Sequence, residues 1–109
     1  MDVYLNLLVG LLVLILPLYF YFFPVKQINA TKGYRTKRSM KNEQSWDLAQ
    51  KYWATVLLKF SSILIGFMIV LFFTIDRDIS ILITLFLWIL ILFISTFLVE
   101  EKLKIKFGN

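Results

Sequence analysis

Three long apolar runs dominate this sequence and leave few folds open to it. They cover about residues 3–23, 54–74 and 79–99. About 20 residues of α-helix, rising about 1.5 Å per residue, cross the roughly 30 Å hydrocarbon core of a bilayer. Each run therefore predicts a membrane-spanning helix. The sequence as a whole predicts an all-α integral membrane protein, built as a three-helix transmembrane bundle.

Composition supports a membrane protein and removes several kinds of chemistry. Hydrophobic residues make up 60% of the 109-residue chain, against roughly 45–50% in soluble domains. The chain has no cysteine and no histidine, which excludes disulfides, thiolate metal sites and the commonest general base. We expect one membrane domain, residues 1–109, with no metal site, no cofactor and no catalytic residues.

A secretory signal peptide is the alternative interpretation of the first run. Such a signal starts with a basic segment, whereas the charged residue before this run is Asp2. We therefore interpret the run as a span. Pro17 is expected to kink its helix and Pro24 to end it.

The basic residues predict the orientation of the chain. Short loops rich in Lys and Arg stay in the cytoplasm. Nearly all the Lys and Arg residues lie in segments 24–53 and 100–109, whereas the second loop has only Arg77, between two acids. We therefore predict a cytoplasmic loop at 24–53, a surface-lying cytoplasmic tail at 100–109 and an outside N-terminus. Because the basic residues flank apolar runs, the net charge of +5 favours anionic lipid headgroups as partners over nucleic acid.

The polar segment Gly33–Trp53, which we call the collar, is the candidate functional region, because it is the only long polar stretch between the apolar runs. Gly33 can supply a positive-φ turn. Ser39 or Asn42 is expected to cap a helix. That helix should continue into the second span, since neither Pro nor Gly occurs between Asn42 and Ile65.

Helical spacing places Trp46, Ala49 and Trp53 on one side of this collar helix. Indole rings favour the headgroup level of a membrane. We interpret the segment as an interfacial helix, which need not be buried in a protein core.

Two acids in the same helix, Glu43 and Asp47, lie one turn apart. A carboxylate pair can do acid–base chemistry or bind a divalent cation. A metal cage needs more oxygen ligands than two, so we favour a simple role at the positive end of the helix. We also predict that Arg35 folds back on both acids, because its planar fork of donors grips carboxylates bidentately.

Small or polar residues recur along each span and predict where the helices touch, because close approach in lipid depends on such residues. They are Asn6, Gly10 and Pro17 in the first span, Thr55, Lys59, Ser62 and Gly66 in the second, and Ser80, Thr84 and Ser95 in the third. Lys59 has two interpretations. It either extends its ammonium group to the basic face or belongs to a polar pocket in the membrane.

The collar also carries a family resemblance. It reads GYRTKRSMKNEQSWDLAQKYW. The positions that match are Gly33, Tyr34, Arg35, Thr36, Ser39, Met40, Glu43, Trp46 and Ala49. In this pattern the chain resembles the SdpI family, integral-membrane immunity proteins that protect bacteria from a secreted killing-factor peptide. An Asn commonly follows that Ala in the family, whereas this chain has Gln50. Longer members carry extra N-terminal membrane helices, so the chain looks like a short, single-module member.

The resemblance implies a multi-pass protein of the bacterial cytoplasmic membrane that confers toxin resistance by binding a secreted antimicrobial peptide. A second copy of the chain is a further expected partner. Two alternatives stay open: a small enzyme acting on lipid headgroups, and an accessory subunit of a transporter. A divalent ion or phosphate beside Glu43 and Arg35 would favour the enzyme, and a large apolar groove at lipid level would favour toxin binding. The expected functional residues are Gly33, Tyr34, Arg35, Thr36, Ser39, Glu43, Trp46, Asp47, Ala49, Gln50 and Lys59.

Overall fold

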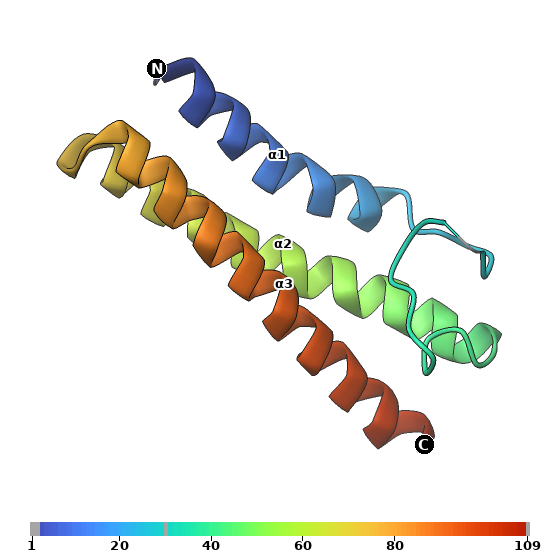
Figure 1. Ribbon diagram of the computed structural model, residues 1–109. Helices are drawn as coiled ribbons and strands as arrows, with labels where there is room; N and C mark the ends of the chain where they lie inside the picture. Colours follow the sequence, from blue (N-terminus) through green and yellow to red (C-terminus); the bar gives the residue numbers. More distant parts are fainter. Residues whose placement is uncertain (1–2, 30, 109) are drawn as a thin grey trace.

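The computed structural model describes residues 3–29 and 31–108, and these form three long helices (Figure 1). The helices are α1 (Val3–Phe22), α2 (Glu43–Thr74) and α3 (Arg77–Phe107). Each is long and apolar enough to cross a membrane. Successive helices run in opposite directions, and α2 packs against both α1 and α3. The prediction of an all-α, three-span protein is confirmed.

The helix ends follow from local hydrogen bonding. Of the two predicted caps for α2, Asn42 is the one used, and its side-chain oxygen accepts a hydrogen bond of 2.8 Å from the Ser45 amide. At the start of α3, the carboxylate of Asp76 accepts from the amide of Asp78 at 2.9 Å. These side chains satisfy amides that the first helical turn leaves without a backbone partner. α1 continues through Pro17 and ends two residues before Pro24.

The predicted surface-lying tail is instead the last part of α3, which continues to Phe107. Val99 and Leu103 are buried there against Tyr34 and Ala49. Val99 and Leu103 are four positions apart, the spacing of one helix face. This helical spacing determines the conformation, although Lys also alternates with Leu and Ile in this segment as it would in a strand.

The predicted contact seam is correct for α1 and α3 and wrong for α2. Asn6 and Pro17 are buried, as are Ser80, Thr84 and Ser95. On α2, by contrast, Lys59, Ser62 and Gly66 are exposed, and a methyl group added at Gly66 would meet nothing within 4 Å. The face of α2 turned to its neighbours carries Ala54, Leu57, Ser61, Leu64 and Met68. The packed face of α2 therefore combines small residues, Ala54 and Ser61, with the larger Leu57, Leu64 and Met68, and it is not the predicted stripe.

Two separate apolar cores result. One lies within the helix bundle and consists of Val9, Val13, Leu64, Met68 and Ile81. The other lies at the collar end and consists of Tyr34, Ala49, Val99 and Leu103. The second core packs the α1–α2 connection (residues 23–42) against the first turns of α2 and the last turns of α3.

Candidate functional site

Trp46 lies inside the collar end rather than at the membrane interface. Its side chain is completely buried, with 0% exposed. The indole Nε1 donates a 2.7 Å hydrogen bond to the carbonyl of Val25, three residues beyond the end of α1. The predicted interfacial position is therefore wrong, because the α1–α2 connection covers this face of α2. Trp46 ties the exit of α1 to the start of α2.

Gln50 holds the backbone of Tyr34 from both sides. The Tyr34 amide donates to Gln50 Oε1 at 2.8 Å, and Gln50 Nε2 donates to the Tyr34 carbonyl at 2.7 Å. Both hydrogen bonds are buried. We call this pair the amide clamp. A single side chain thus forms hydrogen bonds with both backbone groups of Tyr34, and it supplies the acceptor that the buried amide needs.

The amide clamp explains the glycine that precedes Tyr34. Gly33 has φ +94°, a conformation that favours glycine. A Cβ at this position would lie 2.6 Å from Gln50 Oε1 and 3.3 Å from Val25 Cγ2. The predicted positive-φ turn is confirmed, and the space beside it is taken by the clamp.

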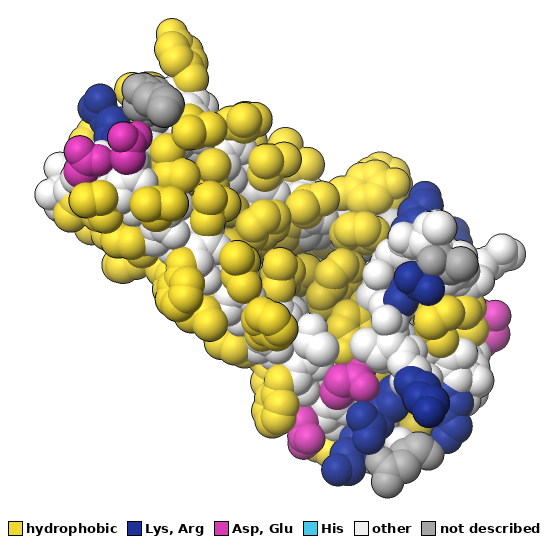
Figure 2. All heavy atoms as spheres, viewed as in Figure 1, with side chains coloured by type: hydrophobic (Ala, Val, Ile, Leu, Met, Phe, Trp, Pro, Cys, Tyr) yellow, Lys and Arg dark blue, Asp and Glu magenta, His cyan; other side chains and the backbone are white. Residues whose placement is uncertain are grey.

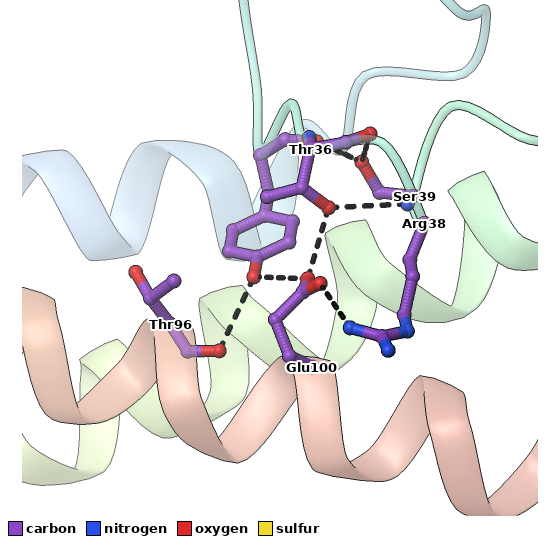
Figure 3. Close-up of polar contacts among 6 residues, drawn as sticks. Thr36, Arg38, Ser39, Thr96 and Glu100 are labelled. Carbon is purple, nitrogen blue, oxygen red and sulfur yellow. Dashed lines mark hydrogen bonds and ion pairs between the residues drawn. The ribbon is translucent and has the colours of Figure 1, made fainter. Parts of the chain in front are cut away.

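A single carboxylate of α3 holds three side chains of the collar (Figure 3). Glu100 Oε2 accepts from the Tyr34 hydroxyl at 2.6 Å and from the Thr36 hydroxyl at 2.9 Å. Glu100 Oε1 accepts from Arg38 Nη1 at 3.3 Å. The Tyr34 hydroxyl also lies 3.2 Å from the Thr96 carbonyl oxygen. We call Tyr34, Thr36, Arg38 and Glu100 the Glu100 cluster.

The environment of Tyr34 keeps its hydroxyl protonated. Burial raises the pKa of Tyr34, and the hydrogen bond and negative charge of Glu100 raise it further. The phenol therefore remains a hydrogen-bond donor to the carboxylate at neutral pH. The Arg38–Glu100 ion pair is more open to solvent, so screening limits its contribution to stability.

Ser39 closes the turn between the Glu100 cluster and the cap of α2. It is fully buried. Its hydroxyl accepts from the Thr36 amide at 2.8 Å and lies 3.1 Å from the Tyr34 carbonyl oxygen. Its own amide donates to the Thr36 hydroxyl at 3.2 Å. Ser39 thus supports the loop rather than capping α2.

Arg35 does not join the two acids of α2. Its Nε donates a 3.0 Å hydrogen bond to the Asn29 carbonyl, and Glu43 and Asp47 lie exposed in the first turns of α2. The predicted contact between Arg35 and these acids is wrong. Within residues 3–29 and 31–108, no three His, Cys, Asp or Glu residues are arranged to hold a metal ion. Lys59 is exposed on α2 rather than enclosed in a polar pocket.

An apolar groove lies at the other end of the bundle, between the first half of α1 and the last third of α2. It encloses about 460 Å³. Leu7, Gly10 and Leu11 line it from α1, and Ile65, Met68 and Ile69 line it from α2. The polar side chain in its wall is that of Asn6. The groove lies in the part of the molecule that Figure 2 shows covered by hydrophobic side chains.

Comparison with known proteins places the collar in a family. The SdpI/YfhL protein family matches residues 26–99, which include the whole collar, all of α2 and most of α3. The chain belongs to this family. It is also 35% identical over 83 residues, or 76% of this chain and 71% of the other, to a protein of Bacillus subtilis (strain 168) named "Uncharacterized protein YfhL". No solved structure matches the chain. Membership of the SdpI/YfhL family suggests a membrane protein of the immunity type.

The structure shows where the expected functional residues of the collar lie. Gly33, Tyr34, Thr36 and Ser39 build the loop, while Trp46, Ala49 and Gln50 form the face of α2 that receives it. Arg35, Glu43 and Asp47 remain on the surface. The signature is thus mainly a folding motif that docks the α1–α2 connection onto the helices.

Sequence analysis missed Glu100, the acceptor that holds the loop to α3. This residue lies one position beyond the part of the chain that matches the SdpI/YfhL family. One signal was present in the sequence. Glu100 directly follows the apolar run 79–99, at the predicted end of the third span, where a negative charge is unfavourable unless it has a partner.

Proposed function

We propose that this protein is an immunity protein that shields a bacterial cell by binding a secreted antimicrobial peptide within the membrane. The observation that carries the proposal is the apolar groove between α1 and α2. A peptide that kills by entering membranes presents apolar side chains at lipid level, and the groove offers an apolar wall at that level. Leu7, Leu11 and Ile69 line it and are exposed, so an entering helix or strand could reach them.

The predicted orientation supports this use of the groove. With residues 24–53 in the cytoplasm, the groove faces the outer half of the bilayer, where a secreted peptide first inserts. Binding there would remove the peptide from the lipid before it assembles with other copies. The energy would come from packing of side chains, because lipid tails are themselves apolar and leave little hydrophobic driving force.

The collar contributes to this function by fixing the walls of the groove. Trp46 and the amide clamp hold the α1–α2 connection against α2. The exit of α1 is thereby fixed relative to α2, and so is the separation of the two helices farther along. On this proposal the collar holds the binding surface in shape and does not touch the peptide.

The experiment places a Trp side chain in the groove and compares the protection given by this variant with that of a control variant, in which the same side chain is added at the neighbouring position outside the groove. Leu11 is 54% exposed and lines the groove, whereas Leu12 is 47% exposed and does not line it. Leu11→Trp should occupy the groove, and Leu12→Trp adds the same ring to the outer surface of α1. Each variant is expressed in a sensitive bacterium at matched membrane levels and challenged with a panel of purified secreted peptide toxins.

Wild type and Leu12→Trp are expected to raise the lethal concentration of at least one peptide. Leu11→Trp is expected to lose about tenfold of that protection, equivalent to about 1.4 kcal/mol of binding. Equal protection by the two variants would rule out the groove as the binding surface. A wild-type protein that protects against none of the peptides in a panel containing the family's killing factor would overturn the immunity function itself.

A further inference from the structure

The α1–α2 connection carries positive charges that no acidic residue within the connection balances. Residues 3–42 contain no Asp or Glu, and the connection holds six basic residues. Glu100 of α3 pairs with Arg38. Lys26, Lys32, Arg35 and Lys37 are exposed, and none of them forms an ion pair with a residue that the structure describes. Lys and Arg side chains gather at this end of the molecule in Figure 2. Such a surface attracts anions.

One of these basic side chains is already held in a fixed direction. The Nε of Arg35 donates to the Asn29 carbonyl at 3.0 Å. The Asn29 side-chain oxygen in turn accepts from the amides of Thr31 at 2.9 Å and Lys32 at 2.7 Å. These bonds hold Thr31, Lys32 and Arg35 close to Asn29. They use only one of the three guanidinium nitrogens of Arg35, so the two terminal nitrogens are left to bind an external group.

Tyr34, the residue before Arg35, fixes the backbone from which the Arg35 side chain extends. Tyr34 is buried, its backbone lies in the amide clamp and its hydroxyl is bound to Glu100. The Arg35 side chain is therefore fixed at two points: at its backbone, next to Tyr34, and at Nε, by the hydrogen bond to the Asn29 carbonyl. A side chain ordered in this way loses less conformational entropy on binding than a free one.

The length of α1 puts the turn at the level of lipid headgroups when α1 spans the membrane. α1 has 20 residues, close to the length that crosses the hydrocarbon core. Phe22 and Phe23 are exposed at its end, at 66% and 67%, where aromatic rings favour the membrane interface. Asn29 follows six residues later, so the turn begins where phosphate groups of the cytoplasmic leaflet are found in the predicted orientation.

We propose that Arg35 and Lys32 bind the phosphate of an anionic phospholipid in the cytoplasmic leaflet. The two terminal nitrogens of Arg35 grip two phosphate oxygens, a geometry that suits a guanidinium and not an ammonium group. Lys32 starts from the same turn and adds a second positive charge. This site is independent of peptide binding in the groove, and it gives the exposed signature residue Arg35 a role that the fold does not require.

The test measures lipid binding to the purified full-length chain in a zwitterionic detergent. Soluble dioctanoyl phosphatidylglycerol is titrated into the protein, and bound lipid is counted by native mass spectrometry. Dioctanoyl phosphatidylcholine tests the need for net negative charge, and millimolar inorganic phosphate tests whether free phosphate is the ligand. The variants are Arg35→Lys, Arg35→Gln and the control Lys37→Gln, which removes an exposed charge that does not contact Asn29.

Wild type is expected to prefer phosphatidylglycerol over phosphatidylcholine. Arg35→Gln should weaken phosphatidylglycerol binding by about tenfold or more, since charge-assisted hydrogen bonds are lost. Arg35→Lys should weaken it nearly as much, and Lys37→Gln should change it less than about twofold. Equal losses for Arg35→Gln and Lys37→Gln would show diffuse attraction and overturn the site. Full competition by inorganic phosphate, or equal binding of the two lipids, would also overturn it.

Discussion

Replacing Gln50 by Leu tests the hydrogen bonds on which the collar depends. Leu is close to Gln in size and has no polar atoms, so Gln50→Leu removes the amide clamp with little change in packing. The Tyr34 carbonyl still has the Ser39 hydroxyl at 3.1 Å. The Tyr34 amide has no such substitute among the described contacts, and it is left buried without an acceptor.

The cost of this substitution can be worked out from the two bonds. Loss of the hydrogen bond to the carbonyl should cost about 0.5–1.5 kcal/mol, and an unsatisfied buried amide about 1–3 kcal/mol. Together these give about 1.5–4.5 kcal/mol. At about 1.4 kcal/mol per factor of ten, the undocked form of the loop should become about 10- to 1,600-fold more populated. The helices have their own backbone bonds and should stay folded, so the effect should be a local opening.

Amide hydrogen exchange of the purified protein in detergent micelles measures this opening directly. The Tyr34 amide should exchange about 10- to 1,600-fold faster in Gln50→Leu than in wild type, and exchange of the amides in the middle of α2 should not change. Gln44→Leu is the matched control, because Gln44 is exposed on the same helix. Similar exchange rates for Tyr34 in the two variants would refute the view that the clamp holds the loop.

Three further predictions follow from the collar end and the orientation. Gly33→Ala should lower the thermal midpoint, since its methyl group would lie 2.6 Å from the clamp oxygen, whereas Gly66→Ala, with open space around it, should leave the midpoint unchanged or raise it. Burial and the neighbouring carboxylate raise the pKa of Tyr34 in the folded protein. Above about pH 10 the tyrosine therefore ionises in the unfolded chain before it ionises in the folded one, and the free energy of unfolding should be constant below that pH and fall above it. Thermal melts should show this loss in wild type and less of it in Tyr34→Phe. In intact cells, a cysteine replacing Arg77 should react with a membrane-impermeant thiol reagent and one replacing Lys37 should not; the opposite labelling would reverse the orientation.

The helices could be predicted from the sequence because their signals are local. Apolar runs of span length, a cap residue before α2 and acids at the start of α3 each act within a few residues. Gly33 is a similar case, since a positive φ is a property of one residue. At these positions the structure agrees with the sequence.

The contacts of the collar could not be predicted because they join distant segments. Periodicity shows that Trp46 and Ala49 share a face, and it does not show that the α1–α2 connection covers that face. The same limit applies to α2, where the stripe with Ser62 and Gly66 points outward and bulkier residues face the neighbouring helices. The error at Arg35 has another cause: charge alone favours Glu43 and Asp47 as its partners, whereas it bonds to an uncharged group, the carbonyl of Asn29, six residues before it.

The Glu100 cluster makes the collar dependent on α3, a helix that is synthesised after it. Glu100 meets partners that precede it by 62 to 66 residues. At roughly 5–20 residues per second of synthesis, these partners wait on the order of 3–13 s before the carboxylate exists. During that interval the Tyr34 and Thr36 hydroxyls have no Glu100 to bind, and the basic loop is held from α2 alone. We therefore expect this loop to be more accessible to proteases in a molecule that lacks α3 than in one whose α3 is in place.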